Sequence, residues 1–239
     1  MTHKKALFVA IEGVDGSGKG TQAEKLVEAL RAEHHRTTLL SFPRYAETLG
    51  GRLVGEYLNG DLVGMQDADP KVRALMFATD RMESRPLIEA HLTVDDILVC
   101  DRYVMSNLAH QAAWVRAEGE EDEGFKRQAF RYWVEQLEFG VFGLPEPDLT
   151  IIFDLPVEQA QKLIAKKTGR AYTDKAADLH EADTEYLRRV RSEYQAGAAS
   201  SGAGRVAYID LMRNGHLRSV DSIHKQVFET VKVMLSRSA

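Results

Sequence analysis

The residues best suited to chemistry lie in a glycine-rich stretch near the N-terminus, Glu12–Thr21, which reads EGVDGSGKGT. An apolar run, Ala6–Ile11, precedes it, and apolar residues at helical spacing follow it. Glycine allows the backbone to curl so that successive N–H groups face an anion at the start of a helix. This order of elements predicts a phosphate-binding loop, in which Lys19 supplies a cation for the β and γ phosphates of a nucleotide. The residues expected to contact those phosphates are Gly13, Gly16, Ser17, Gly18, Lys19, Gly20 and Thr21.

The same loop raises a question about the metal. Loops of this type usually follow the lysine with a serine or threonine that binds magnesium, but here Gly20 occupies that position and Thr21 comes one place later. Asp101, at the end of another apolar run, can hold magnesium through water. We therefore expect Mg²⁺, bound together with ATP, to be held by Thr21 and Asp101. A helix N-cap is the alternative role for Asp101.

Composition excludes several classes of protein. The chain has 239 residues and a net charge of -5, which argues against a dedicated nucleic-acid binder because such proteins need a basic surface. A single cysteine, Cys100, excludes a disulfide framework and a multi-cysteine zinc site. No apolar run approaches the roughly 18 residues of a membrane span, and the N-terminal run is too short for a signal peptide. We therefore expect a cytoplasmic protein that binds neither nucleic acid nor membrane.

The pattern of apolar runs predicts the fold class. Five short runs read as strands: Ala6–Ile11, Thr37–Phe42, Asp96–Cys100, Leu149–Phe153 and Arg205–Ile209. Helical patterns separate them, over residues 21–31, 51–58, 70–78, 85–91, 106–138, 157–167, from about 183, and 220–235. The acidic patch Glu118–Gly124 is expected to be an exposed loop within the fifth pattern. This alternation predicts an α/β fold, a single domain over residues 1–239 in which helices cover both faces of a five-stranded parallel sheet.

In such sheets ligands bind beyond the carboxyl ends of the strands. This rule places the glycine-rich loop, Phe42–Arg44, Asp101–Arg102 and Asp154 around one crevice. Three arginines at or near this crevice, Arg44, Arg81 and Arg102, are then expected to form a clamp for a polyanion. The alternative for each of them is a solvated surface arginine.

Longer motifs carry a resemblance to a known family. FVAIEGVDGSGK at residues 8–19 and DRYVMSNLAHQ at residues 101–111 resemble the two signatures of thymidylate kinases, and FPRY at 42–45 and LEF at 137–139 also match. The resemblance extends from Leu7 to about Tyr194. It implies a single-domain P-loop kinase fold with a mobile lid at about residues 166–180. It also implies transfer of the γ-phosphoryl group of MgATP to dTMP by a homodimeric enzyme. The dimer is expected to use apolar faces around Leu108–Trp114 or Phe130–Leu137.

The resemblance assigns roles around the acceptor base. Phe77 matches the aromatic residue that stacks on the thymine ring, and Arg81, four residues later, matches the one that hydrogen-bonds the base. Asn107 matches a position that reads the base edge. Residues four apart share a helix face, so Phe77 and Arg81 can reach one ligand. Core packing is the alternative for Phe77.

Other matches concern the acceptor phosphate and sugar. Arg44, Tyr45 and Arg102 match the grip on the acceptor monophosphate, and Asp15 matches the carboxylate that contacts the sugar 3'-hydroxyl. His110 stands where many relatives have a tyrosine beneath the sugar, so discrimination against ribonucleotides is less secure than the choice of base. The remaining residues expected on this side are Phe42, Ser106 and Glu181.

Catalysis needs a further cation. Some members place an arginine inside the P-loop, where this chain has Gly16, so the basic lid sequence must supply the charge. Arg170 is the first candidate, ahead of Lys167 and Lys175. The residues expected to act in catalysis are Asp15, Lys19, Arg102 and Arg170.

Two other functions fit the same loop. Another nucleoside monophosphate kinase, acting on UMP, CMP or AMP, would share the P-loop, since GKGT also resembles the adenylate kinase loop. A non-catalytic nucleotide-binding module would use the same cradle without an acceptor site.

Overall fold

The computed structural model describes residues 6–116, 120–165, 183–197 and 204–238. Five parallel strands form one sheet in the order β2-β3-β1-β4-β5. The strands are β1 (Leu7–Gly13), β2 (Thr37–Ser41), β3 (Ile97–Asp101), β4 (Leu149–Asp154) and β5 (Arg205–Asp210). The predicted five-stranded parallel sheet is therefore confirmed. Every residue of the central strand β1 is buried, as expected for a strand covered on both faces.

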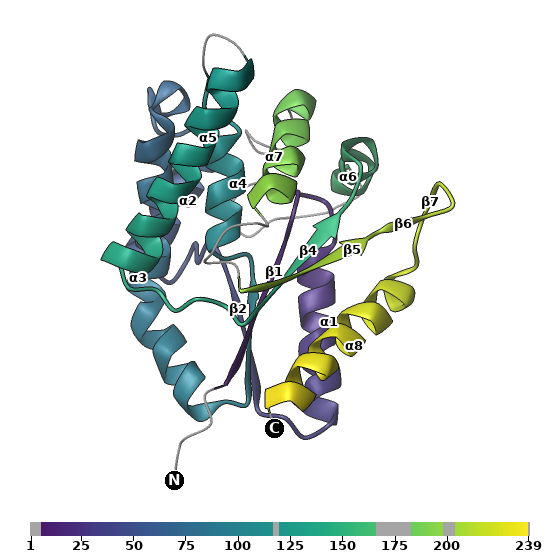
Figure 1. Ribbon diagram of the computed structural model, residues 1–239. Helices are drawn as coiled ribbons and strands as arrows, with labels where there is room; N and C mark the ends of the chain where they lie inside the picture. Colours follow the sequence, from purple (N-terminus) through teal and green to yellow (C-terminus); the bar gives the residue numbers. More distant parts are fainter. Residues whose placement is uncertain (1–5, 117–119, 166–182, 198–203, 239) are drawn as a thin grey trace.

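Helices cover both faces of this sheet (Figure 1). The helices α1 (Lys19–Ala32) and α8 (Val220–Ser238) pack together on one face. On the other face lie α3 (Pro70–Val94), α4 (Val104–Ala112) and α5 (Glu120–Glu135). Further elements extend this layer: α2 (Leu49–Asn59) packs on α3, α7 (Thr184–Gly197) on α4, and α6 (Val157–Ile164) on α7. Among the helices of the described ranges, none is long and apolar enough to cross a membrane.

The strand register brings the chemical groups together. Ile11 of β1 and Ser41 of β2 are both paired with Asp101 of β3, and Gly13 is paired with Phe153 of β4. The P-loop therefore leaves the sheet beside the residues that follow β3 and β4. The buried apolar core beneath this edge is continuous across the sheet and includes Phe8, Leu98 and Ile151.

Two local predictions were wrong. The patterns at 70–78 and 85–91 belong to one helix, α3, which continues through Pro86. A proline costs one backbone hydrogen bond, but tertiary packing of the flanking turns, with Ser84 and Ile88 buried, holds the helix together. The acidic patch is not a loop throughout, because α5 begins at Glu120. Acidic residues stabilise the positive end of a helix, which explains why this sequence can start one.

Apolar residues of the predicted dimer faces pack inside the protomer, and the dimer itself stays a prediction. Leu108 and Ala112 on α4, and Phe130 and Val134 on α5, are buried within this chain. Their apolar faces are used for packing inside the protomer. A short hairpin, β6 (Met212–Arg213) and β7 (His216–Leu217), was not predicted. Two short helical segments, Met65–Asp67 and the π-helix Gln136–Val141, complete the described elements. The predicted lid at 166–180 lies outside the described residues.

Candidate active site

The P-loop takes the shape that its glycines allow. Gly16 and Gly18 both have φ of 80°, a left-handed conformation that L side chains rarely adopt. Gly18 is also the N-cap of α1, so the loop ends directly on a helix N-terminus. A Cβ atom at Gly16 would lie 2.4 Å from the carbonyl oxygen of Ala160. Helix α6 therefore leaves no room for a side chain at Gly16.

Lys19 is held against the loop. Its Nζ donates a hydrogen bond to the Val14 carbonyl oxygen at 2.9 Å, and the side chain is buried. Burial, followed by the nearby charge of Arg102, lowers the pKa of Lys19 to about 8. An anion beside the ammonium group would stabilise its charged form. Ser17 Oγ is also buried and has no hydrogen-bond partner in the described part of the chain. Both groups suit the phosphates predicted for this loop.

The residues beside Gly20 fit a magnesium ion. A Cβ atom on Gly20 would lie 3.1 Å from Asp101 Oδ2, so this carboxylate faces the first turn of α1. Asp101 Oδ1 is buried without a hydrogen-bond partner among the described residues. Carboxylate oxygens are the hard ligands that Mg²⁺ prefers. Thr21 is exposed on α1, and the described ranges contain no cluster of three acidic, histidine or cysteine ligands. Asp101 is therefore the better supported of the two predicted metal residues.

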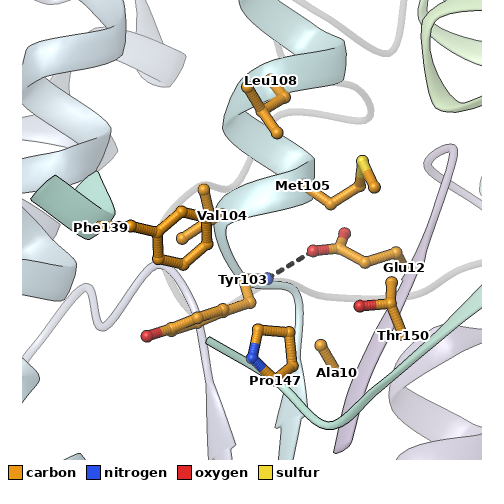
Figure 2. A pocket seen from close by; sticks show the side chains of 9 residues that line it. All are labelled: Ala10, Glu12, Tyr103, Val104, Met105, Leu108, Phe139, Pro147 and Thr150. Carbon is orange, nitrogen blue, oxygen red and sulfur yellow. Dashed lines mark hydrogen bonds between the residues drawn. The ribbon is translucent and has the colours of Figure 1, made fainter. Parts of the chain in front are cut away.

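Glu12 is a site residue that the sequence analysis missed. It follows the apolar part of β1 and is completely buried. Its Oε1 accepts the backbone N–H groups of Tyr103 at 2.7 Å and Ser106 at 3.1 Å, as Figure 2 shows for Tyr103. A carboxylate from β1 thus caps the N-terminus of α4. Burial raises the pKa of Glu12, although Ser106 and Arg102 oppose the shift. The signal that could have identified Glu12 is a charged residue at the end of an apolar strand, directly before a glycine-rich loop.

Arg102 joins the two sides of the crevice. Its backbone has φ of 66°, which turns the chain sharply between β3 and α4. Its Nη2 donates to Asp15 Oδ1 of the P-loop in a close ion pair. Its Nη1 donates to Ser106 Oγ at 3.1 Å and lies 3.5 Å from His110 Nε2. The structure therefore brings four predicted residues together around one guanidinium group, namely Asp15, Arg102, Ser106 and His110.

The predicted role of Ser106 as a substrate ligand is not supported. Its hydroxyl donates to Glu12 Oε2 at 2.5 Å and lies 3.0 Å from the hydroxyl of Tyr194. The same oxygen accepts from Arg102. These three protein partners saturate the hydroxyl group. Ser106 therefore holds Arg102, and it does not offer a hydrogen bond to a ligand.

The segment after β2 is built around Asp80. This buried carboxylate accepts the backbone N–H of Arg44 at 3.0 Å and the hydroxyl of Thr48 at 2.5 Å. The Arg44 side chain is half-buried, and its Nη1 donates to Ser84 at 3.3 Å. Phe42 is buried against Tyr103, so its ring supports the segment and does not face a ligand as predicted.

Phe77 and Tyr45 share a small apolar cluster. Both are partly buried and pack on Val54, Tyr57, Leu58 and Met76. The Phe77 ring meets Tyr57 edge to face, with ring centres 6.3 Å apart. Phe77 is partly exposed, which is consistent with its predicted stacking role.

Arg81 forms an ion pair inside the protein. Its Nε and Nη2 donate to the two oxygens of Glu138 at 2.5 and 2.7 Å, and both side chains are almost completely buried. Two of its three guanidinium nitrogens are thus paired with Glu138, which takes Arg81 out of the predicted phosphate clamp. The predicted hydrogen bond from Arg81 to the acceptor base stays a prediction. Asn107 Nδ2 also donates to Glu138, at 2.7 Å, and to the Ala74 carbonyl oxygen at 2.9 Å. Asn107 Oδ1 is buried and has no hydrogen-bond partner among the described residues.

Gln111 is a second residue that the sequence analysis missed. It lies one helical turn after Asn107 on α4 and is completely buried. Both of its amide atoms lack a hydrogen-bond partner in the described ranges. Buried amides are normally paired, so a side chain of this kind beside a site indicates a polar ligand. The sequence signal for Gln111 is its position four residues after Asn107, which places both amides on the same face of one helix. The predicted residues Arg170 and Glu181 lie outside the described residues.

Comparisons with known proteins agree with this geometry. The family model described as Thymidylate kinase matches residues 11–212. The thymidylate kinase of Mycobacterium tuberculosis is 35% identical over 201 residues, which cover 83% of this chain and 89% of the relative. The human thymidylate kinase is 35% identical over 162 residues, covering 68% of this chain and 67% of the relative.

A solved structure supports the fold. The thymidylate kinase of Candida albicans superposes with a TM-score of 0.69 at 22% identity, covering 96% of this chain and 92% of that one. The P-loop, the paired Asp15 and Arg102, and the matched family model all point the same way. On this evidence, the chain belongs to the thymidylate kinase family.

Proposed function

We propose that this crevice binds MgATP at the P-loop and dTMP between α3 and α4, and that it aligns the two for direct transfer. As a thymidylate kinase, the protein is an ATP-dependent enzyme that transfers the γ-phosphoryl group to dTMP, giving dTDP and ADP. No activated nucleophile beside a base is present among the described residues of the crevice, which supports in-line transfer without a covalent intermediate. ATP and dTMP are cytoplasmic metabolites, which supports a cytoplasmic location.

Asn107 carries the proposal for the acceptor base. Because its Nδ2 is committed to Ala74 and Glu138, the side-chain amide is held in one orientation. Oδ1 is then fixed as an acceptor. Such a group pairs with the N3–H donor of thymine or uracil and leaves the N3 acceptor of cytosine unpaired. Phe77, which is partly exposed, would stack on the same base, and Gln111 would complete its polar edge.

Arg102 and Arg44 would hold the acceptor phosphate. Arg102 is already aligned by Asp15, Ser106 and His110, so little reorganisation is needed when a phosphate arrives. Burial lowers the pKa of Arg102, but the neighbouring acidic groups, led by Asp15, raise it by more. The pKa therefore lies well above its usual value, and the group stays cationic. Lys19 and the loop N–H groups would bind the donor phosphates. Thus cations lie on both sides of the group being transferred.

Magnesium would be held by Asp101, whose unpartnered Oδ1 supports this role. When bound, the ion neutralises charge on the ATP phosphates. The protein's own contribution is to present a carboxylate beside a residue with no side chain, Gly20, so that room remains for the metal and its waters. Thr21 remains a predicted ligand. The lid cation, Arg170, also remains a prediction from the sequence.

The test is a coupled assay of ADP formation with dTMP, dUMP, dCMP, UMP, CMP and AMP. The wild-type protein is expected to turn over dTMP and dUMP at least about 100-fold more efficiently than dCMP, since a mismatched buried acceptor is costly. Asn107→Ala should lower kcat/KM for dTMP and reduce the ratio of dTMP to dCMP. Gln128→Ala, at an exposed site on α5, is the matched amide control.

Several outcomes would contradict the proposal. Faster turnover of AMP or CMP than of dTMP would assign the protein to another acceptor. ATP binding without turnover of any acceptor would favour a nucleotide-binding module. An unchanged ratio of dTMP to dCMP in Asn107→Ala would remove Asn107 from base recognition.

We also propose a homodimer that uses the outer faces of α2 and α3, which pack against each other. Large apolar side chains there are between 38% and 73% exposed, a pattern that favours a partner surface. These residues are Leu49, Leu53, Val72, Leu75 and Met82. Light scattering should give twice the chain mass for the wild-type protein. Leu75→Glu should give monomers, whereas Val233→Glu on α8 should not; a monomeric wild-type protein would contradict the proposal.

A further inference from the structure

Two tyrosine hydroxyls reach the site from α7, a helix with no predicted role. Tyr186 and Tyr194 are buried and stand eight residues apart, a little more than two helical turns, so they lie on one face of α7. That face packs on α4, which runs beside α7 in Figure 1. On α4, Ser106 and His110 are four residues apart and also share a face. Two pairs of side chains therefore meet across the α4–α7 contact.

The first pair is His110 and Tyr186. The Tyr186 hydroxyl donates its single hydrogen to the His110 carbonyl oxygen at 3.2 Å. The Tyr186 hydroxyl oxygen lies 3.0 Å from His110 Nδ1. Because the hydroxyl hydrogen is already used, the ring nitrogen is the donor in this second contact. A hydrogen on Nδ1 of the neutral ring leaves Nε2 as an acceptor, and Nε2 faces Arg102 Nη1 at 3.5 Å. Tyr186 thus selects the tautomer of His110 that accepts from the arginine.

The second pair is Ser106 and Tyr194. The two hydroxyl oxygens lie 3.0 Å apart, and Glu12 Oε2 lies 3.2 Å from the Tyr194 oxygen, so the single hydrogen of Tyr194 is shared between Ser106 Oγ and Glu12 Oε2. Ser106 gives its own hydrogen to Glu12, which leaves one lone pair for the Tyr194 hydroxyl and one for Arg102 Nη1. Burial raises the pKa of Tyr186 and of Tyr194 well above the usual value. Both hydroxyls therefore keep their hydrogens throughout the working pH range.

Helix α7 is itself fixed on its other sides. Arg189 Nε donates to the Ala113 carbonyl oxygen at the end of α4, at 3.0 Å. Buried Glu193 accepts from Arg127 at 3.4 Å and, more closely, from Arg131, both on α5. Arg191 forms a two-pronged pair with Asp154 at the end of β4, at 2.5 and 2.9 Å. The tyrosines therefore project from a helix whose position is set by three neighbouring elements.

We propose that Tyr186 and Tyr194 are positioning residues: acting through His110 and Ser106, they fix the Arg102 guanidinium group where the acceptor phosphate binds. This inference rests on the proposed role of Arg102. Arg102 Nη1 faces two acceptors, Ser106 Oγ and His110 Nε2, and a tyrosine hydroxyl of α7 contacts each of these two residues. Helix α7 therefore sets the rotation of the guanidinium plane. Without the hydroxyls, Arg102 stays charged and stays paired with Asp15, but its Nη1 side is less constrained. Acceptor affinity then falls because the arginine must be ordered when dTMP binds.

The test is a set of steady-state measurements on Tyr186→Phe, Tyr194→Phe and the double variant. Phenylalanine keeps the ring, so the stacking of residue 186 on Trp114, with ring centres 4.7 Å apart, is preserved. Loss of one neutral hydrogen bond corresponds to about a fivefold effect. We expect KM for dTMP to rise about fivefold in each single variant and further in the double variant. KM for ATP should stay within about twofold of the wild-type value, because the P-loop is not touched.

A cycle with Arg102→Met separates this inference from the proposed function. Adding Tyr186→Phe to Arg102→Met should change KM for dTMP no further, because the tyrosine acts through the arginine. Tyr208→Phe is the control, since its hydroxyl bonds to the α7 carbonyl oxygens of Tyr194 and Gln195, at 3.3 and 3.2 Å, away from Arg102. It should leave both KM values unchanged.

The outcomes are distinct. A normal KM for dTMP in both tyrosine variants, with a raised one in Arg102→Met, would overturn this inference alone. Equal rises in KM for dTMP and for ATP would also overturn it, because they would show a general structural role. An unchanged KM for dTMP in Arg102→Met would overturn the proposed role of Arg102 and this inference with it.

Discussion

Arg81 and Glu138 form a two-pronged ion pair that is almost completely removed from solvent, with nitrogen–oxygen distances of 2.5 and 2.7 Å. Arg81 comes from α3, and Glu138 comes from the π-helix that follows α5. Glu138 also holds the amide nitrogen of Asn107 on α4. One carboxylate therefore ties together the three elements that would surround the acceptor base.

Glu138→Gln is expected to destabilise the protein by about 3–5 kcal/mol, because it leaves the charge of Arg81 buried without its partner. Urea unfolding monitored by circular dichroism measures this change. The double variant Arg81→Met/Glu138→Leu removes both charges and should recover much of the lost stability. If Glu138→Gln unfolds at the wild-type urea concentration, the pair is not important for stability.

Gly16 and Gly18 of the P-loop share the same backbone conformation, so alanine variants at the two positions can be compared directly. Gly16→Ala and Gly18→Ala both force a side chain to adopt φ of 80°, which costs roughly 1 kcal/mol or more. Only at Gly16 would the new Cβ meet another atom closely, the Ala160 carbonyl oxygen at 2.4 Å. Gly16→Ala should therefore lower the melting temperature and raise KM for ATP more than Gly18→Ala does. Equal effects in differential scanning fluorimetry and kinetics would contradict the steric argument.

The lowered pKa of Lys19 predicts proton uptake when nucleotide binds. With a pKa of about 8, roughly half of the lysines are neutral at pH 8, and bound phosphates should charge them. Calorimetry of ATP binding at pH 8, in buffers of different ionisation enthalpy, should show uptake of about half a proton. Lys19→Arg, which keeps its charge, should show none. A wild-type protein that takes up no proton would contradict the prediction.

The same shift has a consequence for the nucleotide-free protein. The pKa of Lys19 is lower in the folded protein than the value of 10.5 expected for the unfolded chain. Protonation therefore favours the unfolded state, and this group's contribution to the free energy of unfolding decreases as pH falls from 10.5 through about 8. In Lys19→Met this part of the pH dependence should disappear from unfolding curves measured between those two values.

Asp101→Asn is expected to shift magnesium activation. Loss of the carboxylate charge beside Gly20 should raise the Mg²⁺ concentration needed for half-maximal activity by roughly 10-fold or more. Asp96→Asn is the control, because Asp96 precedes the other end of β3 and pairs with Arg36 at the surface, at 2.9 Å. Superimposable magnesium titrations for wild type and Asp101→Asn would remove Asp101 from the metal site.

The sequence by itself determined the fold class and the donor side of the site. Strands such as β1 and β3 are short and almost entirely apolar, so local composition specifies them as buried parallel strands. The P-loop is similarly local, because its conformation depends on glycines within a few residues of one another. The helix break predicted between residues 78 and 85 was wrong, because tertiary packing holds α3 continuous where local propensity does not require it.

Only the tertiary structure decided the acceptor side. Arg81 and Glu138 are 57 residues apart, and Tyr194 lies 182 residues from Glu12, so no local pattern can report their contacts. An arginine paired internally and one that faces a ligand look alike in sequence. In the structure, the Arg81 side chain pairs with buried Glu138, and the Ser106 hydroxyl donates to buried Glu12. It also revealed Glu12, Gln111 and the two tyrosines of α7, because burial and hydrogen bonding are properties of the folded chain.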